Sequence, residues 1–137
     1  MSNRNDGTID RRAAVAALLR DPGELLVVSG LGAPTYDVAA AGDRALNFYL
    51  WGAMGGTAMV GLGLALAQKH RRVLVLTGDG DMLMGLGSLA TIAAAGAPNL
   101  AIAVLRIAPE EQPRHLPPRD GAHLTDRFRR ALGVAAG

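Results

Sequence analysis

The sequence contains no cysteine, few aromatic residues and no long uninterrupted apolar run. The lack of cysteine excludes disulfide bonds, thiolate metal ligands and cysteine nucleophiles. Because only 4% of residues are aromatic, the core must consist mainly of Ala, Val, Leu, Ile and Met. No stretch is long enough to cross a bilayer, and the polar N-terminus precedes no signal-type apolar segment. We therefore expect a cytoplasmic protein with no membrane association.

The sequence also lacks a large excess of charge of either sign. The chain has 14 basic and 12 acidic residues for a formal net charge of +2. They are interspersed, without an arginine block or interleaved aromatics, which argues against a nucleic-acid partner. With 137 residues, half of them hydrophobic, the chain is long enough for one domain with a substantial core but too short for two ordinary domains.

Short apolar stretches with strand or helix character alternate along the chain. Strand-like segments end at a glycine or a polar residue, and the helix-like segments between them are rich in small residues. The strands are expected over 24–29, 72–77 and 100–105, all buried, and the helices over 10–19 (capped by Asp10), 55–68, 83–95 and 124–132.

This alternation predicts an α/β fold: a doubly wound, mostly parallel sheet with helices on both faces. In such sheets ligands lie at the carboxyl ends of the strands, where Gly30 to Gly32, Gly78 to Gly80 and Arg106 would meet. We expect a single domain over residues 1–137 with its core in 10–105. The remainder, 106–137, is an irregular tail, and its polar, proline-rich part over 108–121 has no helix or strand period. That part is expected to be a loop or a disordered stretch.

The sequence Gly78-Asp79-Gly80-Asp81 follows a strand and opens a helix. Free backbone N–H groups and the helix dipole favour an anion there, and glycines let a phosphate approach the backbone. Asp79 would repel that phosphate unless a divalent cation lay between them, and Mg²⁺ held by carboxylate and diphosphate oxygens resolves the conflict. The alternative is an ordinary strand-to-helix turn with a capping aspartate.

The run from Thr77 to Ile92 closely resembles the cofactor motif of thiamine-diphosphate enzymes. Upstream, Asn47 to Ala67 resembles the pyrimidine-side segment of that family, and Ser29 to Thr35 resembles its first active-site loop. Together these motifs cover roughly Glu24 to Leu105 and resemble the diphosphate-binding part of sulfopyruvate and phosphonopyruvate decarboxylases.

The resemblance implies a site for thiamine diphosphate and Mg²⁺. Asp79 would be a magnesium ligand, the backbone carbonyl of Gly52 would accept from the aminopyrimidine, and Met54 would be the apolar wedge that bends the cofactor. Met82 and Met84 are expected to be core residues instead. The residues expected at the cofactor are Gly52, Ala53, Met54, Gly78, Asp79, Gly80 and Asp81.

The resemblance also implies a carboxy-lyase that acts on a small 2-oxoacid together with another chain. In this family a glutamate from a separate pyrimidine-binding domain activates the cofactor. Glu24, Glu110 and Glu111 are not placed to supply it, so we expect no catalytic residue in this chain. A pyrimidine-binding subunit, a second copy of this chain, or both, should also cover apolar surface on its small-residue helices.

The family pattern breaks after the strand at 100–105. Where the family has an asparagine as second magnesium side chain, this sequence has Ile107, preceded by Arg106, and the fold is expected to be shortened at the C-terminus. A degenerate subunit, a frameshifted or truncated gene, or an altered cofactor site would each explain the break. A remnant that acts only in assembly is therefore an alternative function, and a Rossmann-like nucleotide-binding domain is another.

Overall fold

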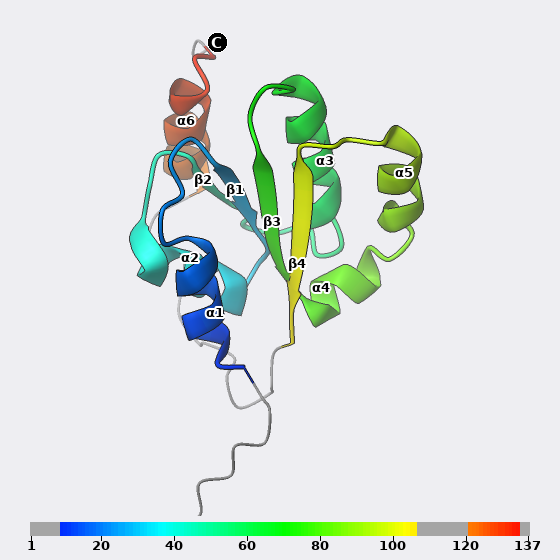
Figure 1. Ribbon diagram of the computed structural model, residues 1–137, viewed down its shortest axis with the longest axis horizontal. Helices are drawn as coiled ribbons and strands as arrows, with labels where there is room; N and C mark the ends of the chain where they lie inside the picture. The colour runs from blue at the N-terminus through cyan, green and yellow to red at the C-terminus, as the bar shows by residue number, and fades with distance from the viewer. Residues whose placement is uncertain (1–8, 107–120, 135–137) are drawn as a thin grey trace, which may run out of the picture.

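The computed structural model describes residues 9–106 and 121–134. A four-stranded parallel sheet lies at its centre, in the order β2-β1-β3-β4 (Figure 1). The strands are β1 (Leu26–Ser29), β2 (Asn47–Tyr49), β3 (Val73–Gly78) and β4 (Leu100–Leu105). This confirms the expected doubly wound α/β fold.

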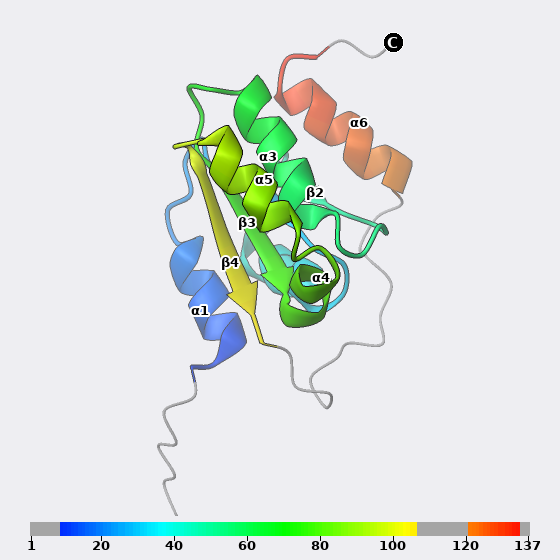
Figure 2. The same cartoon turned by 90° about the vertical axis from the view of Figure 1, so that its right-hand side faces the viewer.

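Helices cover both faces of the sheet (Figure 2). The helices α1 (Arg11–Leu18) and α2 (Ala33–Gly42) lie on one face, where Val15 and Val38 share a core cluster. The other face carries α3 (Thr57–Ala67), α4 (Asp79–Met84) and α5 (Ser88–Ala95), and α6 (Gly121–Ala131) lies beside β2. No helix in the described ranges is long and apolar enough to cross a membrane.

The core has two parts, one on each side of the sheet. Val27, Leu74 and Leu76 face α1 and α2, whereas Leu26, Val73 and Val75 face α3. The approach of α3 is close because Gly61 lies against Val75, and any Cβ at position 61 would overlap that side chain. Asp10 accepts a hydrogen bond from the backbone N–H of Ala13 at 2.6 Å, which confirms the expected cap of α1.

Local structure differs from the sequence analysis in four places. The segment Ser29 to Thr35, which resembles an active-site loop, already contains the first turn of α2, and β2 was not foreseen because it has only three residues. The helix expected over 83–95 is two helices separated at Gly85 to Gly87. β4 is only partly buried, since it is the last strand on its side of the described sheet. The loop expected over 108–121 lies mostly outside the described residues.

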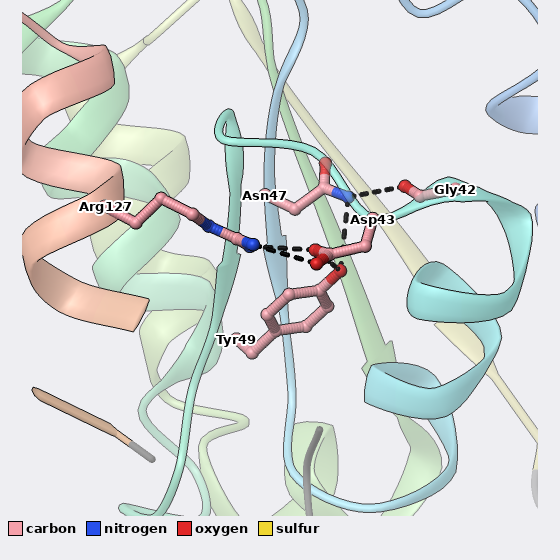
Figure 3. A network of polar contacts seen from close by, with 5 residues as sticks. All are labelled: Gly42, Asp43, Asn47, Tyr49 and Arg127. Carbon is pink, nitrogen blue, oxygen red and sulfur yellow. Dashed lines mark hydrogen bonds and ion pairs between the residues drawn. The ribbon is translucent and has the colours of Figure 1, made fainter. Parts of the chain in front are cut away.

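A polar network attaches α6 to the strand β2 (Figure 3). Both terminal nitrogens of the Arg127 guanidinium donate to the Asp43 carboxylate at 2.8 Å, and the Tyr49 hydroxyl donates to the same group at 2.8 Å. The side-chain amide of Asn47 donates to the Gly42 carbonyl at 3.0 Å. Beside the network, the rings of Phe48 and Phe128 have their centroids 5.2 Å apart. The expected last helix is thus confirmed and is held by both polar and apolar contacts.

The helices α3 to α5 leave much apolar surface uncovered. α5 has no buried residue, and Met84 is 66% exposed rather than part of the core, whereas Met82 is buried as expected. We call this surface the α3–α5 apolar face, and its large members are Met59, Val60, Leu66, Leu83, Met84, Leu86 and Leu89. Such a surface is typical of a protein–protein interface.

Candidate cofactor site at the carboxyl ends of the strands

The topology selects one place on the sheet for a ligand. The chain leaves β1 towards β2 on one side and leaves β3 towards β4 on the other. A crevice between neighbouring strands whose connections diverge in this way is where doubly wound proteins bind ligands. Here it lies past Ser29 in β1 and past Gly78 in β3, where the strand arrows of Figure 1 end.

The end of β3 presents an open, glycine-lined turn. Gly78 is the last residue of the strand, and Asp79 and Gly80 begin α4. A Cβ on Gly80 would meet no atom within 4 Å, so the space beside its backbone is free. Asp79 is half-buried, and one of its carboxylate oxygens accepts from the Gly80 N–H at 3.0 Å in an exposed contact. This turn has room for a phosphate and a carboxylate available to a cation.

Asp81 points into the protein rather than towards that space. It is buried, with 6% of its surface exposed. Its Oδ1 accepts from the backbone N–H of Gly55 at 2.5 Å, and its Oδ2 accepts from the Thr77 hydroxyl. Both carboxylate oxygens therefore have protein donors, a role that was not inferred from the sequence.

The segment Gly52 to Gly56 lies at the same edge of the sheet, where Gly55 contacts Asp81 across a sequence separation of 26 residues. Leu50 N–H donates to the Ser29 carbonyl at 2.9 Å, which continues the β1–β2 pairing to the edge. Met54 is 50% exposed, and the space beside Gly52 is free. The structure thus brings the two sequence-predicted groups, Gly52 to Met54 and Gly78 to Asp81, to the same edge.

The turn after β1 is closed on itself. The Thr35 hydroxyl donates to the Gly30 carbonyl at 2.8 Å and lies 3.2 Å from the Ser29 hydroxyl. Since these groups are buried and bonded to one another, they shape the edge of the crevice.

Arg106 also belongs to this edge. Leu105 pairs with Gly78 in the sheet, so Arg106 follows β4 at the level where Asp79 follows β3. Its side chain is exposed. Ile107 lies outside the described residues, and within the described ones no cluster of three or more His, Cys, Asp or Glu side chains could hold a metal.

Comparison with known proteins decides the family. Residues 28–106 match the model of the thiamine pyrophosphate enzyme C-terminal TPP-binding domain. The chain belongs to this family. The match begins in the second half of β1 and ends just past β4, so it contains β2, β3, β4 and all of the cofactor residues expected from the sequence.

Curated relatives of this TPP-binding domain include decarboxylases. It is 48% identical over 80 residues to the sulfopyruvate decarboxylase subunit beta of Methanothermobacter thermautotrophicus, which covers 58% of this chain and 43% of that protein. It is 44% identical over 102 residues to the phosphonopyruvate decarboxylase of Streptomyces hygroscopicus, covering 74% of this chain and 25% of that protein. The chain thus spans less than half the length of these relatives.

Proposed function

We propose that this chain is the thiamine-diphosphate- and Mg²⁺-binding subunit of a two-chain 2-oxoacid decarboxylase that acts on sulfopyruvate, phosphonopyruvate or a similar small acid. The observation that carries the proposal is the meeting of Gly52 to Met54 with Gly78 to Asp81 at the crevice between β1 and β3. The names of the relatives support the reaction class.

The residues at this edge fit the cofactor. The backbone of the turn that follows the buried Gly78, with free space beside Gly80, would hold the diphosphate, and Asp79 would bind Mg²⁺. Since the described residues contain no cluster of three or more metal-ligating side chains, diphosphate oxygens and water would complete the magnesium shell around Asp79. The free space beside Gly52 suits the aminopyrimidine, with Ala53 and the half-exposed Met54 next to it.

When bound, thiamine diphosphate would supply the carbon nucleophile that adds to the 2-oxoacid and the electron sink for loss of CO₂. The task of this chain would be to bind and orient the cofactor. Asp79 would hold the Mg²⁺ whose positive charge offsets that of the diphosphate, Gly52 would accept a hydrogen bond from the aminopyrimidine, and Met54 would exclude water from one side of it.

A partner would complete the site. We infer a pyrimidine-binding chain that contributes the glutamate needed to activate the aminopyrimidine. The α3–α5 apolar face supports an assembly of this kind, because its large side chains lie on helices that neighbour the crevice. A relative from Methanocaldococcus jannaschii is likewise named as a subunit, beta, of sulfopyruvate decarboxylase.

One observation favours the second candidate, a remnant that assembles but does not bind the cofactor. Arg106 brings a positive charge to the strand level of Asp79, where a cation must bind. A guanidinium can instead pair with diphosphate oxygens. In the remnant, Arg106 would repel the metal ion. In the cofactor-binding subunit, it would pair with diphosphate oxygens.

Calorimetry separates the two candidates. Thiamine diphosphate with Mg²⁺ is titrated into this chain mixed with the pyrimidine-binding chain, and into the same mixture carrying Arg106→Asp and Ile107→Asn. The proposal predicts saturable, Mg²⁺-dependent heat for the natural sequence. Heat from the double variant alone would identify a remnant that has lost its metal ligands, and heat from neither would refute cofactor binding by this fold.

A further inference from the structure

A buried carboxylate joins two segments of the proposed site. Asp81 accepts from the Gly55 N–H, in the loop before α3, and from the Thr77 hydroxyl, in β3. A buried charge is costly unless hydrogen bonds compensate it, and charge-assisted bonds of this type are about twice as strong as neutral ones. The loop before α3 is therefore tied to the strand that ends at the diphosphate turn.

The end of β1 leaves room for this carboxylate. A Cβ on Gly30 would lie 3.0 Å from Asp81 Oδ2, 2.9 Å from Thr77 Oγ1 and 3.2 Å from Thr57 Oγ1. A side chain at position 30 would thus displace the group. The Thr57 hydroxyl is buried without a hydrogen-bond partner in the described part of the chain, so a further donor stands beside the carboxylate.

A second contact joins the same loop to the break between α4 and α5. A Cβ on Gly85 would overlap the Gly55 carbonyl oxygen and lie 2.8 Å from the carbonyl carbon. A Cβ on Gly55 would lie 3.1 Å from the Met84 carbonyl carbon, and Gly55 has a φ of +89°. The two backbones approach so closely that neither position has room for a side chain.

Between these attachments lies an unusual backbone conformation. Ala53 has a φ of +56°, the one positive value among the described non-glycine residues. Such a conformation persists when surrounding contacts impose it. Here the Gly56 N–H donates to the Ala53 carbonyl at 2.9 Å, closing a turn that exposes Met54.

We propose that Asp81 and the Gly55–Gly85 contact form a clamp that fixes the Gly52–Gly56 loop and so positions Met54 for the cofactor. Asp81 is then a positioning residue that binds the protein backbone, not a diphosphate ligand. The part that concerns the cofactor rests on the proposed function, whereas the clamp itself is a property of the free chain.

The test compares Asp81→Ala and Gly85→Ala with the control Gly87→Ala. A Cβ on Gly87 would meet no atom within 4 Å, so the control adds the same methyl group two residues away without a collision. In the free chain, hydrogen exchange of the Gly55 amide is followed by NMR. Both clamp variants should lose protection at Gly55 and retain it in the strand β3, and Gly87→Ala should match the natural protein.

Cofactor affinity is the second readout, measured on the chain mixed with its partner. If the clamp variants hold the productive loop conformation about one tenth of the time, the apparent Kd rises about tenfold, with no change for Gly87→Ala. Should Gly85→Ala fail to fold, Asp81→Ala decides, with Asp81→Asn as its control, because Asn keeps an acceptor for Gly55. Unchanged Gly55 protection in folded Asp81→Ala would overturn the clamp. An absence of cofactor binding by the natural protein would instead refute the proposed function alone, since the exchange experiment is independent of it.

Discussion

The two edges of the described sheet, the β2 flank and the β4 flank, differ in how well helices cover them. On the β2 flank α6 packs against the strand, whereas α5, the helix next to β4 in sequence, has no buried residue. Leu124 and Phe128 of α6 are 1% and 7% exposed, and Arg127 joins Asp43 through two hydrogen bonds. Leu83, Leu86 and Leu89, near the other flank, are between 41% and 68% exposed. The difference shows that α6 covers the β2 flank within the described residues, and it supports the proposed partner at the α3–α5 apolar face.

The largest expected loss of stability comes from a substitution in α6, on the β2 flank. Phe128→Ala removes a buried ring that packs on Phe48, and such truncations cost about 3 kcal/mol or more. We expect the free energy of unfolding, measured by urea titration with circular dichroism, to fall by about this amount. Leu89→Ala on the other flank should change it by less than about 0.5 kcal/mol, as is usual for exposed positions. Equal losses in the two variants would remove the distinction between the flanks.

The polar network of the β2 flank gives a smaller, pH-dependent effect. Burial and the neighbouring Asp43 raise the pKa of Tyr49 to about 12, although the hydrogen bond with Asn47 opposes the shift. The ordinary value is about 10, so the folded protein holds the phenol proton more tightly than the unfolded chain. The raised pKa of Tyr49 therefore adds to the free energy of unfolding below pH 10. This stabilisation is lost as the pH rises to 12, a change on the order of 2 kcal/mol.

The control for that contribution is Tyr49→Phe, which lacks the titrating group. The difference in unfolding free energy between the natural protein and this variant should shrink between pH 10 and pH 12. A constant difference over this range would show that Tyr49 has the same pKa in the folded and unfolded protein, and that the polar network does not raise it.

A substitution in the α3–α5 apolar face should have the smallest effect on the free energy of unfolding. Its effect on binding of a partner chain should be large. Leu89→Lys should leave the unfolding free energy within about 0.5 kcal/mol of the natural value and abolish binding to the pyrimidine-binding chain. The matched control is Leu18→Lys, a 50% exposed position of α1 on the opposite face of the sheet. Sedimentation of the mixed chains measures both, and equal binding by the two variants would place the interface elsewhere.

The two regions also differ in how far the sequence predicted them. The central strands were predicted because β1 and β3 are continuous apolar runs bounded by glycine or polar residues, and the motif at Gly78 to Asp81 indicated the family. The strand β2 was missed because three residues carry no period, and its strand conformation comes from pairing with β1. Uncovered apolar surface on the small-residue helices was expected, but the residues that form it were not identified. A helix rich in alanine and leucine has the same composition whether the protein itself or a partner covers it.

Asp81 shows the same limit within the site. Its position in the motif predicted a diphosphate ligand, but its orientation depends on Gly55, which reaches it only through the folding of β2 and α3. The glycines at positions 55 and 85 were the available signal for this arrangement. Their backbones approach each other so closely in the folded chain that side chains are excluded at both positions.

Release of CO₂ tests the central claim, that the crevice between β1 and β3 functions once a partner covers the α3–α5 apolar face. Sulfopyruvate and phosphonopyruvate are each incubated with this chain, with the pyrimidine-binding chain, and with both, in the presence of thiamine diphosphate and Mg²⁺. The account predicts CO₂ from one of these acids with the mixture alone, and its loss with Asp79→Ala. Release by this chain without a partner, or full release by the Asp79→Ala mixture, would contradict the account.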